Sequence, residues 1–143
     1  MANSLIDSDV YIDFLQSGRF HTEIARLYAE HTPGLHFSSV VIEELLAGAT
    51  SPDERKNVEL LYVPFERASR VVAPSHANWR DVGNLLARIF REQPSYRSKL
   101  PHVVADCLIA LSARAIGATV YTRNRADFEL LQRFRHFPLV VLE

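Results

Sequence analysis

Short apolar runs alternate along the chain with longer stretches in which apolar residues recur every three or four positions. The short runs are typical of buried strands, and the longer stretches are typical of amphipathic helices. The runs predict strands at residues 4–7, 35–40, 69–75, 119–124 and 139–143. The helical spacing predicts helices at residues 20–31, 40–49, 51–63, 78–90, 102–118 and 127–134. The polar stretch at 92–101 is expected to be a turn region.

This alternation predicts the class of the fold. Strands that are separated by helices indicate βαβ units, in which helices cover a mostly parallel sheet through right-handed crossovers. We therefore expect an α/β fold, specifically a three-layer α/β/α sandwich with a mostly parallel central sheet. The 143 residues contain no linker and no internal repeat, so a single domain over residues 1–143 is expected. Ligands of such sheets bind outside the carboxyl ends of the strands, and Asp7 follows the first strand directly.

Composition limits the partners and the compartment. The net charge is −1, and 14 of the 16 basic residues are arginine. Any nucleic acid must therefore be held by a local arginine patch rather than by bulk charge, unless the arginine content only reflects genome composition. Cys107 is the single cysteine, which excludes an internal disulfide and favours a cytoplasmic protein. No apolar run is long enough to span a membrane.

Four carboxylates fall at positions where charge is costly or where strands end. Asp7 follows a strand, and Glu44 and Asp106 lie on helices beside apolar residues. Asp127 and Asn124 follow the strand at 119–124. If the acids converge, their repulsion requires a cation, and hard carboxylate oxygens select Mg²⁺ or Mn²⁺. Each acid alone also has a structural reading, as a helix cap or as a solvent-facing helix residue.

Four segments, taken in order and spacing, resemble the PIN-domain ribonucleases, and especially the VapC-type toxins of bacterial toxin–antitoxin pairs. The segments are LIDSDVYIDFL, SSVVIEELLAGA, ADCLIALSARAIGATVYTRNRADF and LVVLE. The resemblance implies a PIN-like fold and a metal-dependent endoribonuclease that uses Mg²⁺ or Mn²⁺. It also implies an RNA substrate, a homodimer and a VapB-like antitoxin that inserts a segment into the active-site groove.

The same resemblance assigns roles to individual residues. Asp7 and Asp106 match the direct metal ligands, and Glu44 and Asp127 match acids that bind a second ion or order water. In the implied mechanism Ser8 and Thr122 are hydroxyls that orient a carboxylate, and Asn124 stands beside the last acid. Independently of the resemblance, Arg123, Arg125, Arg133 and Arg135 cluster after the same strand and are candidates for holding RNA phosphates. A turn serine, a strand threonine and a solvated arginine face are the alternatives for these positions.

Two positions depart from the family pattern. Asp9 stands where the family commonly has asparagine, and Leu111 stands where a second alanine is usual. Asp9 could strengthen metal binding or face away and cap the following helix, and the sequence does not decide between the two.

Two other functions compete with the nuclease. The Asp-Ser-Asp stretch also begins phosphatases of the haloacid-dehalogenase type, but this chain has Tyr11 where they need threonine or valine, and it lacks their glycine–aspartate pair. A non-catalytic RNA- or protein-binding module of PIN-like fold is the second alternative. Loss of cleavage in EDTA would distinguish the nuclease from such a module.

Overall fold

The predicted alternation of strands and helices forms a parallel α/β sheet structure. The computed structural model describes residues 2–30 and 33–143. Within these residues the strands are β1 (Asn3–Ile6), β2 (Leu35–Ser38), β3 (Val71–Val72), β4 (Ala118–Thr122) and β5 (Leu139–Val141). They form one sheet in the order β3-β2-β1-β4-β5, and every pair of neighbours is parallel. The predicted parallel sheet is confirmed.

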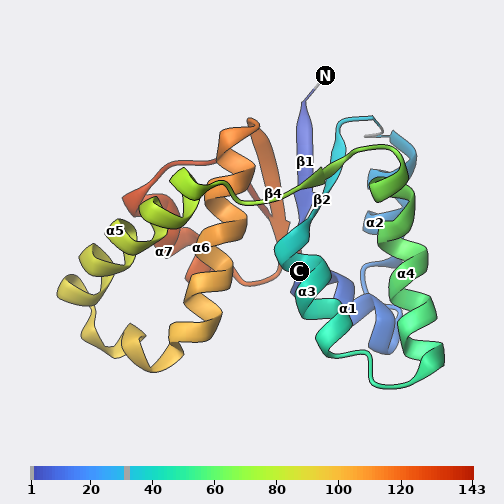
Figure 1. The fold of residues 1–143 in the computed structure, drawn as a ribbon, viewed down its shortest axis with the longest axis horizontal. Coiled ribbons are helices and arrows are strands. Elements are labelled where there is room, and N and C mark those ends of the chain that lie inside the picture. The colour runs from blue at the N-terminus through green and yellow to red at the C-terminus, as the bar shows by residue number, and fades with distance from the viewer. Residues whose placement is uncertain (1, 31–32) are drawn as a thin grey trace.

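Helices cover both faces of this sheet. In the same residues they are α1 (Ser8–Ser17), α2 (His21–Glu30), α3 (Ser39–Ala47), α4 (Pro52–Arg67), α5 (His76–Glu92), the 3₁₀ helix η1 (Pro94–Lys99), α6 (Leu100–Ala115) and α7 (Arg125–Phe134). Figure 1 shows α1 to α4 on one side of the sheet and α5, α6 and α7 on the other. The expected α/β/α layering is therefore confirmed.

Some helices and strands begin or end at residues other than those predicted. Strand β3 has two residues where seven were expected, and α7 begins at Arg125, two residues early. The predicted helix at 20–31 is α2, which ends at Glu30, and His31 lies outside the described residues. Met1, the first residue of the predicted domain, also lies outside them.

Helix α1 was not predicted. Its first turns carry Val10, Tyr11 and Ile12, which favour strands by composition and conceal the helical period. The signals that were present are at its ends. Asp7 caps the helix by accepting from the Ser8 N–H, and Gly18 ends it in the left-handed conformation with φ 75°.

The predicted polar turn at 92–101 is instead η1 followed by the start of α6. Pro94 and Pro101 each lie in the first turn of a helix, where the missing N–H costs nothing. These prolines mark helix starts and not a simple turn. None of the helices in residues 2–30 and 33–143 combines the length and apolar character needed to cross a membrane.

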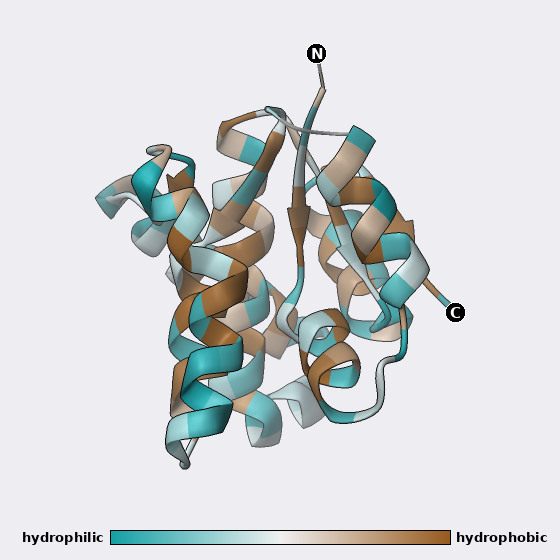
Figure 2. Ribbon diagram, turned by 90° about the vertical axis from the view of Figure 1, so that its right-hand side faces the viewer, coloured by the Kyte–Doolittle hydropathy of each residue, from teal (hydrophilic) through white to brown (hydrophobic). Residues whose placement is uncertain are grey.

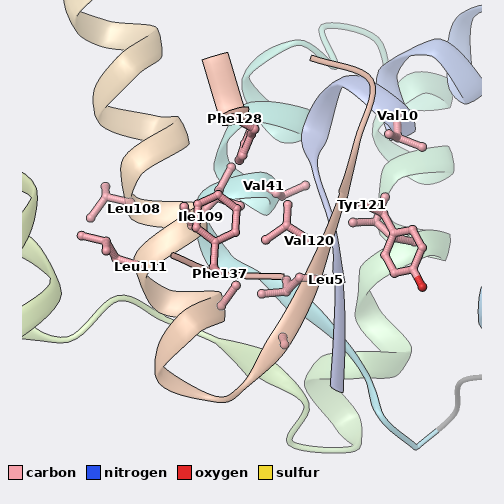
Figure 3. Packing of buried hydrophobic residues seen from close by; sticks show 14 of the residues in the cluster. Leu5, Val10, Val41, Leu108, Ile109, Leu111, Val120, Tyr121, Phe128 and Phe137 are labelled. Atoms are coloured by element: carbon pink, nitrogen blue, oxygen red, sulfur yellow. The ribbon is translucent and has the colours of Figure 1, made fainter. Parts of the chain in front are cut away.

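The core fills the space between the sheet and both helical layers. Figure 3 shows Leu5, Ile109 and Val120 together on one side of β1 and β4, with Tyr121 on the other side. Neighbouring residues of a strand point to opposite faces of the sheet, so Val120 and Tyr121 pack in different helical layers. Leu5, Ile109 and Val120 are each 0% exposed. This packing fixes the positions at which the strands end.

Strand β1 lies in the middle of the sheet, between β2 and β4. The chain leaves β1 toward β2 and β3, and later returns past β1 to form β4. The carboxyl ends of β1 and β4 therefore flank the point where the strand order reverses, which is where ligands bind in open parallel sheets. Figure 2 shows the chain changing from hydrophobic to hydrophilic directly after β1 ends.

Candidate active site at the carboxyl end of the sheet

Asp7 is the residue that joins β1 to α1, and it is only 3% exposed. Its Oδ1 accepts from the Ser8 N–H at 2.8 Å, and its Oδ2 accepts from the Thr122 hydroxyl at 2.8 Å. Its own N–H donates to the Tyr121 carbonyl at 2.8 Å. The two sequence readings of Asp7, a helix cap and a member of an acidic site, are thus compatible. The helix cap fixes the direction of the carboxylate.

Asp9 faces the same site. Both of its carboxylate oxygens lie 3.4 Å from the Thr122 hydroxyl, and the Arg123 N–H donates to Oδ1 at 3.5 Å. Of the two roles that the sequence left open for Asp9, the structure therefore favours an additional carboxylate beside Asp7. Burial raises the pKa of Asp9, while hydrogen bonds and the charge of Arg123 act in the opposite direction.

Glu44 enters from α3, on the face of the sheet that α1 also covers. Its Oε1 atom is buried, and no residue in the described part of the chain donates a hydrogen bond to it. Burial raises the pKa of Glu44, and a hydrogen bond from Ser8 partly offsets this. The preceding residue, Glu43, is exposed.

Asp106 enters from α6, on the opposite face of the sheet. Burial raises its pKa, and the negative charges of Asp127, Glu44 and Asp9 act in the same direction, so that together they bring it to about 8. Every influence on this carboxyl disfavours its charged form. The acids of α3, α6 and the β1–α1 junction therefore interact across the end of the sheet.

Asp127 lies in the first turn of α7 and is held by three side chains. The Asn124 amide donates to Oδ2 at 3.0 Å, and the Tyr96 hydroxyl donates to Oδ1 at 3.4 Å. The Lys99 ammonium lies 4.0 Å from Oδ1. Asn124 also caps α7 by accepting from the Asp127 N–H. Lys99 therefore places a positive charge beside Asp127.

The pKa of Asp7 shows that the acids repel one another. Burial raises this pKa well above its ordinary value, and the charges of Asp9 and Asp106 raise it further, against the lowering effect of the Thr122 hydrogen bond. A buried carboxylate that faces other carboxylates is stable only if it is protonated or if a cation is present. The five acids are Asp7, Asp9, Glu44, Asp106 and Asp127.

The donor set fits a divalent cation. It consists of carboxylate oxygens, which Mg²⁺ and Mn²⁺ prefer, and it includes the buried and unpartnered Oε1 of Glu44. Among the described residues, no three of the His, Cys, Asp or Glu side chains already stand close enough to hold one ion. An ion would therefore have to draw the carboxylates together, which the removal of their repulsion favours.

The two arginines expected near the site differ in position. Arg123 follows Thr122, and it forms an ion pair with Asp13, in which Nε lies 2.8 Å from Asp13 Oδ2. Arg125 pairs with Glu129 at 3.3 Å and with Glu143 at 2.8 Å, and with none of the five acids. The structure thus brings Arg123, but not the guanidinium of Arg125, into contact with the residues of the site.

Sequence reasoning missed three residues that support the site. Tyr96 and Lys99 contact Asp127 from the segment interpreted as a polar turn, and Asp13 holds Arg123 from the helix that was not predicted. The spacing of Tyr96 and Lys99, three residues apart after Pro94, was a signal for one helical turn with both side chains on one face. Asp13 stands four residues after Asp9, which is the corresponding signal on α1.

Together, the fold and the site define a parallel α/β domain with a buried acidic cluster where the strand order reverses. The model of the family described as PIN domain matches residues 4–133, and the chain belongs to this family. The resemblance seen in the sequence is confirmed. A comparison with curated proteins finds no significant match.

Solved structures share this fold over nearly the whole chain. A chain of the DNA-bound VapBC from Salmonella typhimurium has a TM-score of 0.68 and 22% identity, covering 99% of this chain and 98% of that one. A chain of VapBC2 from Rickettsia felis, bound to a promoter DNA fragment, has a TM-score of 0.66 and 18% identity, with 98% of each chain covered. A chain of FitAB bound to an IR36 DNA fragment has a TM-score of 0.64 and 21% identity, covering 97% and 96%.

Proposed function

We propose that this protein is a Mg²⁺- or Mn²⁺-dependent endoribonuclease that hydrolyses RNA phosphodiester bonds as the toxin of a toxin–antitoxin pair. The observation that carries the proposal is the meeting of five carboxylates from both faces of the sheet. Burial raises the pKa values of four of them, Asp7, Asp9, Glu44 and Asp106, and the charges of other acids raise the pKa values of Asp7 and Asp106 as well. Such a group costs stability unless it binds a cation. Membership of the PIN domain family supports the same reading.

In this proposal Asp7 and Asp106 would hold one ion, and Glu44 and Asp127 would hold a second ion or order water. When bound, a divalent ion supplies positive charge that makes water acidic enough to act as a nucleophile and that offsets charge developing on the phosphate. No side chain of the protein needs to act as the nucleophile. Asp9 adds a further carboxylate at the site.

The chain's own contacts orient these groups. The Ser8 N–H and the Thr122 hydroxyl each hold one oxygen of Asp7, so this carboxylate cannot rotate freely. Asn124 and Tyr96 do the same for the two oxygens of Asp127. Glu44 Oε1, which is buried without a donor in the described residues, can accept a hydrogen bond from a water molecule. Fixed ligands reduce the reorganisation that the reaction requires.

The partners are proposed from the similar structures. These structures are of VapBC, VapBC2 and FitAB, each bound to DNA. We propose that this chain binds an antitoxin, forms a homodimer, and acts on RNA in the cytoplasm. The antitoxin would block the acidic site until it is released.

The proposal is tested with purified protein and a labelled single-stranded RNA. We expect cleavage with Mn²⁺, no cleavage with EDTA, and recovery when Mn²⁺ is restored. Glu44 and Glu43 form a matched pair on α3, because they are adjacent and only Glu44 reaches the site. Glu44→Gln should lower the rate at least about tenfold, and Glu43→Gln should leave it unchanged. A folded protein that binds RNA and never cuts it would support the non-catalytic module instead.

A further inference from the structure

Asp13 is a carboxylate outside the acidic cluster that engages two arginines. It lies one helical turn after Asp9 on α1, so both side chains lie on the same face of the helix. Its Oδ2 forms an ion pair with Arg123, whose Nε lies 2.8 Å away, and accepts a hydrogen bond from Arg19 Nη1 at 3.3 Å. The Asp13 side chain is 18% exposed, while the two arginines are half-exposed.

Arg123 stands at the edge of the cluster. It directly follows Thr122 at the end of β4, and its backbone N–H donates to Asp9 Oδ1 at 3.5 Å. Its charge is close enough to act on the Asp9 carboxylate. Because Asp13 binds the Nε atom, the two terminal nitrogens of Arg123 remain without a partner in residues 2–30 and 33–143. A guanidinium held in this way presents two donors in a fixed plane.

Arg19 differs from Arg123 although both contact the same carboxylate. Arg19 follows the carboxyl end of α1, whereas Asp9 lies at the amino end of this helix. The Arg19 guanidinium also stacks on the Phe20 ring, with its centre 4.5 Å from the ring centroid. Arg19 is thus held away from the acids, and it provides a control with the same charge and the same partner.

We propose that Asp13 is a positioning residue that holds Arg123 so that its terminal nitrogens bind an RNA phosphate beside the acidic site. This inference rests on the proposed function, because it takes RNA as the ligand. An exposed ion pair contributes little to stability, so the pair's effect is expected in binding and not in folding. A fixed guanidinium binds phosphate at a smaller loss of side-chain entropy than a free one.

Asp13 also determines which carboxylate Arg123 pairs with. Asp9 accepts from the Arg123 backbone N–H, and its carboxylate is under the influence of the Arg123 charge, so without Asp13 the guanidinium would turn toward the cluster. It would then neutralise an acid and leave the phosphate without its donor. Asp13→Asn should therefore weaken RNA binding even though it removes a negative charge, which bulk electrostatics predicts would strengthen binding. The two explanations differ in sign.

The test measures RNA binding in EDTA, where no cleavage occurs, by fluorescence anisotropy of a labelled single strand at several salt concentrations. Arg123→Gln should weaken binding about tenfold and reduce the salt slope by about 0.7, the value for one lost phosphate contact on a single strand. Asp13→Asn should weaken binding about threefold or more, and it should have no further effect in the Arg123→Gln protein. Arg19→Gln, with the same change in charge, should bind nearly as well as the wild type.

Each outcome bears on the proposal. Asp13→Asn binding as tightly as the wild type or more tightly, additive effects of the two substitutions, or equal losses for Arg19→Gln and Arg123→Gln would each overturn it. Absence of RNA binding by the wild type would overturn it as well. If Asp13→Asn fails to fold, Arg123→Lys gives the same test, because it keeps the charge and loses the Nε contact; wild-type binding by this variant would contradict the proposal.

The proposed nuclease activity fails in a different way. If the single and double substitutions of Asp13 and Arg123 change RNA binding as expected but the wild type does not cleave RNA with Mn²⁺, the positioning role of Asp13 stands and the nuclease does not. If the wild type cleaves RNA but the effects of the two substitutions on binding are additive, the nuclease stands and the role of Asp13 does not.

Discussion

The two ends of the central sheet treat polar groups in opposite ways. At the amino end, donors meet acceptors: the Asn3 amide donates to the Ile116 carbonyl at 2.8 Å, and the Ser4 N–H donates to the Gly34 carbonyl at 2.9 Å. The His36 ring nitrogen Nδ1 lies 2.8 Å from the same Gly34 carbonyl. Each of these contacts stabilises the fold by satisfying a backbone carbonyl.

At the carboxyl end, acceptors face acceptors. Asp7, Asp9 and Asp106 act on one another through like charge, and Glu44 Oε1 is buried without a donor in the described residues. The difference indicates that the two ends of the sheet have different roles. The amino end contributes to stability, and the carboxyl end keeps a repulsion that a bound cation would relieve.

The largest expected effect is on activity at the carboxyl end. Asp7→Asn keeps the volume and the helix cap but removes a proposed ligand charge, so RNA cleavage should fall at least about 100-fold. Expression of the wild type without its antitoxin should arrest growth, and Asp7→Asn should relieve the arrest. Circular dichroism should show an unchanged fold. A folded Asp7→Asn protein with full cleavage and toxicity would remove Asp7 from the proposed set of ligands.

The sequence identified this end of the molecule because acids after strands are visible in a single chain. Asp7, Glu44, Asp106 and Asp127 all interrupt apolar patterns or follow them, and charge in such places needs an explanation. The structure brings these four predicted acids to one end of the sheet. Their role as metal ligands stays a prediction.

Other parts of the site could not be read from the sequence, because they depend on contacts between distant segments. The direction of the Asp9 side chain is set by Thr122 and Arg123, which follow it by more than a hundred residues. The contact of Tyr96 with Asp127 requires η1 to pack against α7. Local periodicity predicts which residues form a helix, but it does not predict which helices meet.

A second prediction concerns the pH dependence of stability without divalent ions. The folded protein holds a proton on Asp106 up to about pH 8, whereas the unfolded chain releases it near the ordinary pKa of 3.8. Stability from this group is complete below about pH 4 and is lost as the pH rises toward 8. Urea unfolding in EDTA should give a free energy of unfolding about 3 kcal/mol lower at pH 8 than at pH 5.5. Asp106→Asn should flatten this dependence, and equal slopes for both proteins would contradict the prediction.

A third prediction concerns metal binding. At pH 8 in EDTA, Asp106→Asn should be neutral or stabilising, because it removes repulsion and keeps the shape, whereas most buried substitutions destabilise. Mn²⁺ at ten times its dissociation constant should stabilise the wild type by about 1.4 kcal/mol and the variant far less. Thermal melts of both proteins in the two conditions measure this. Parallel shifts would show that Asp106 does not contribute to the site.

The smallest effect is expected at the amino end. Asn3→Ala leaves the Ile116 carbonyl without its side-chain donor and should cost about 1 kcal/mol of stability. This loss should be the same with EDTA and with Mn²⁺, and RNA cleavage should be unchanged.

Asn3→Asp tests the difference between the two ends directly, because it places a carboxylate against the Ile116 carbonyl and so recreates the arrangement of acceptors found at the carboxyl end. Its cost should grow above about pH 4, as the new carboxyl loses the proton it could donate. Mn²⁺ should not relieve this cost, since one carboxylate and one carbonyl do not supply the charge that a divalent ion needs. Relief by Mn²⁺ would show that cation binding does not depend on the converging acids, and the distinction between the two ends would fail.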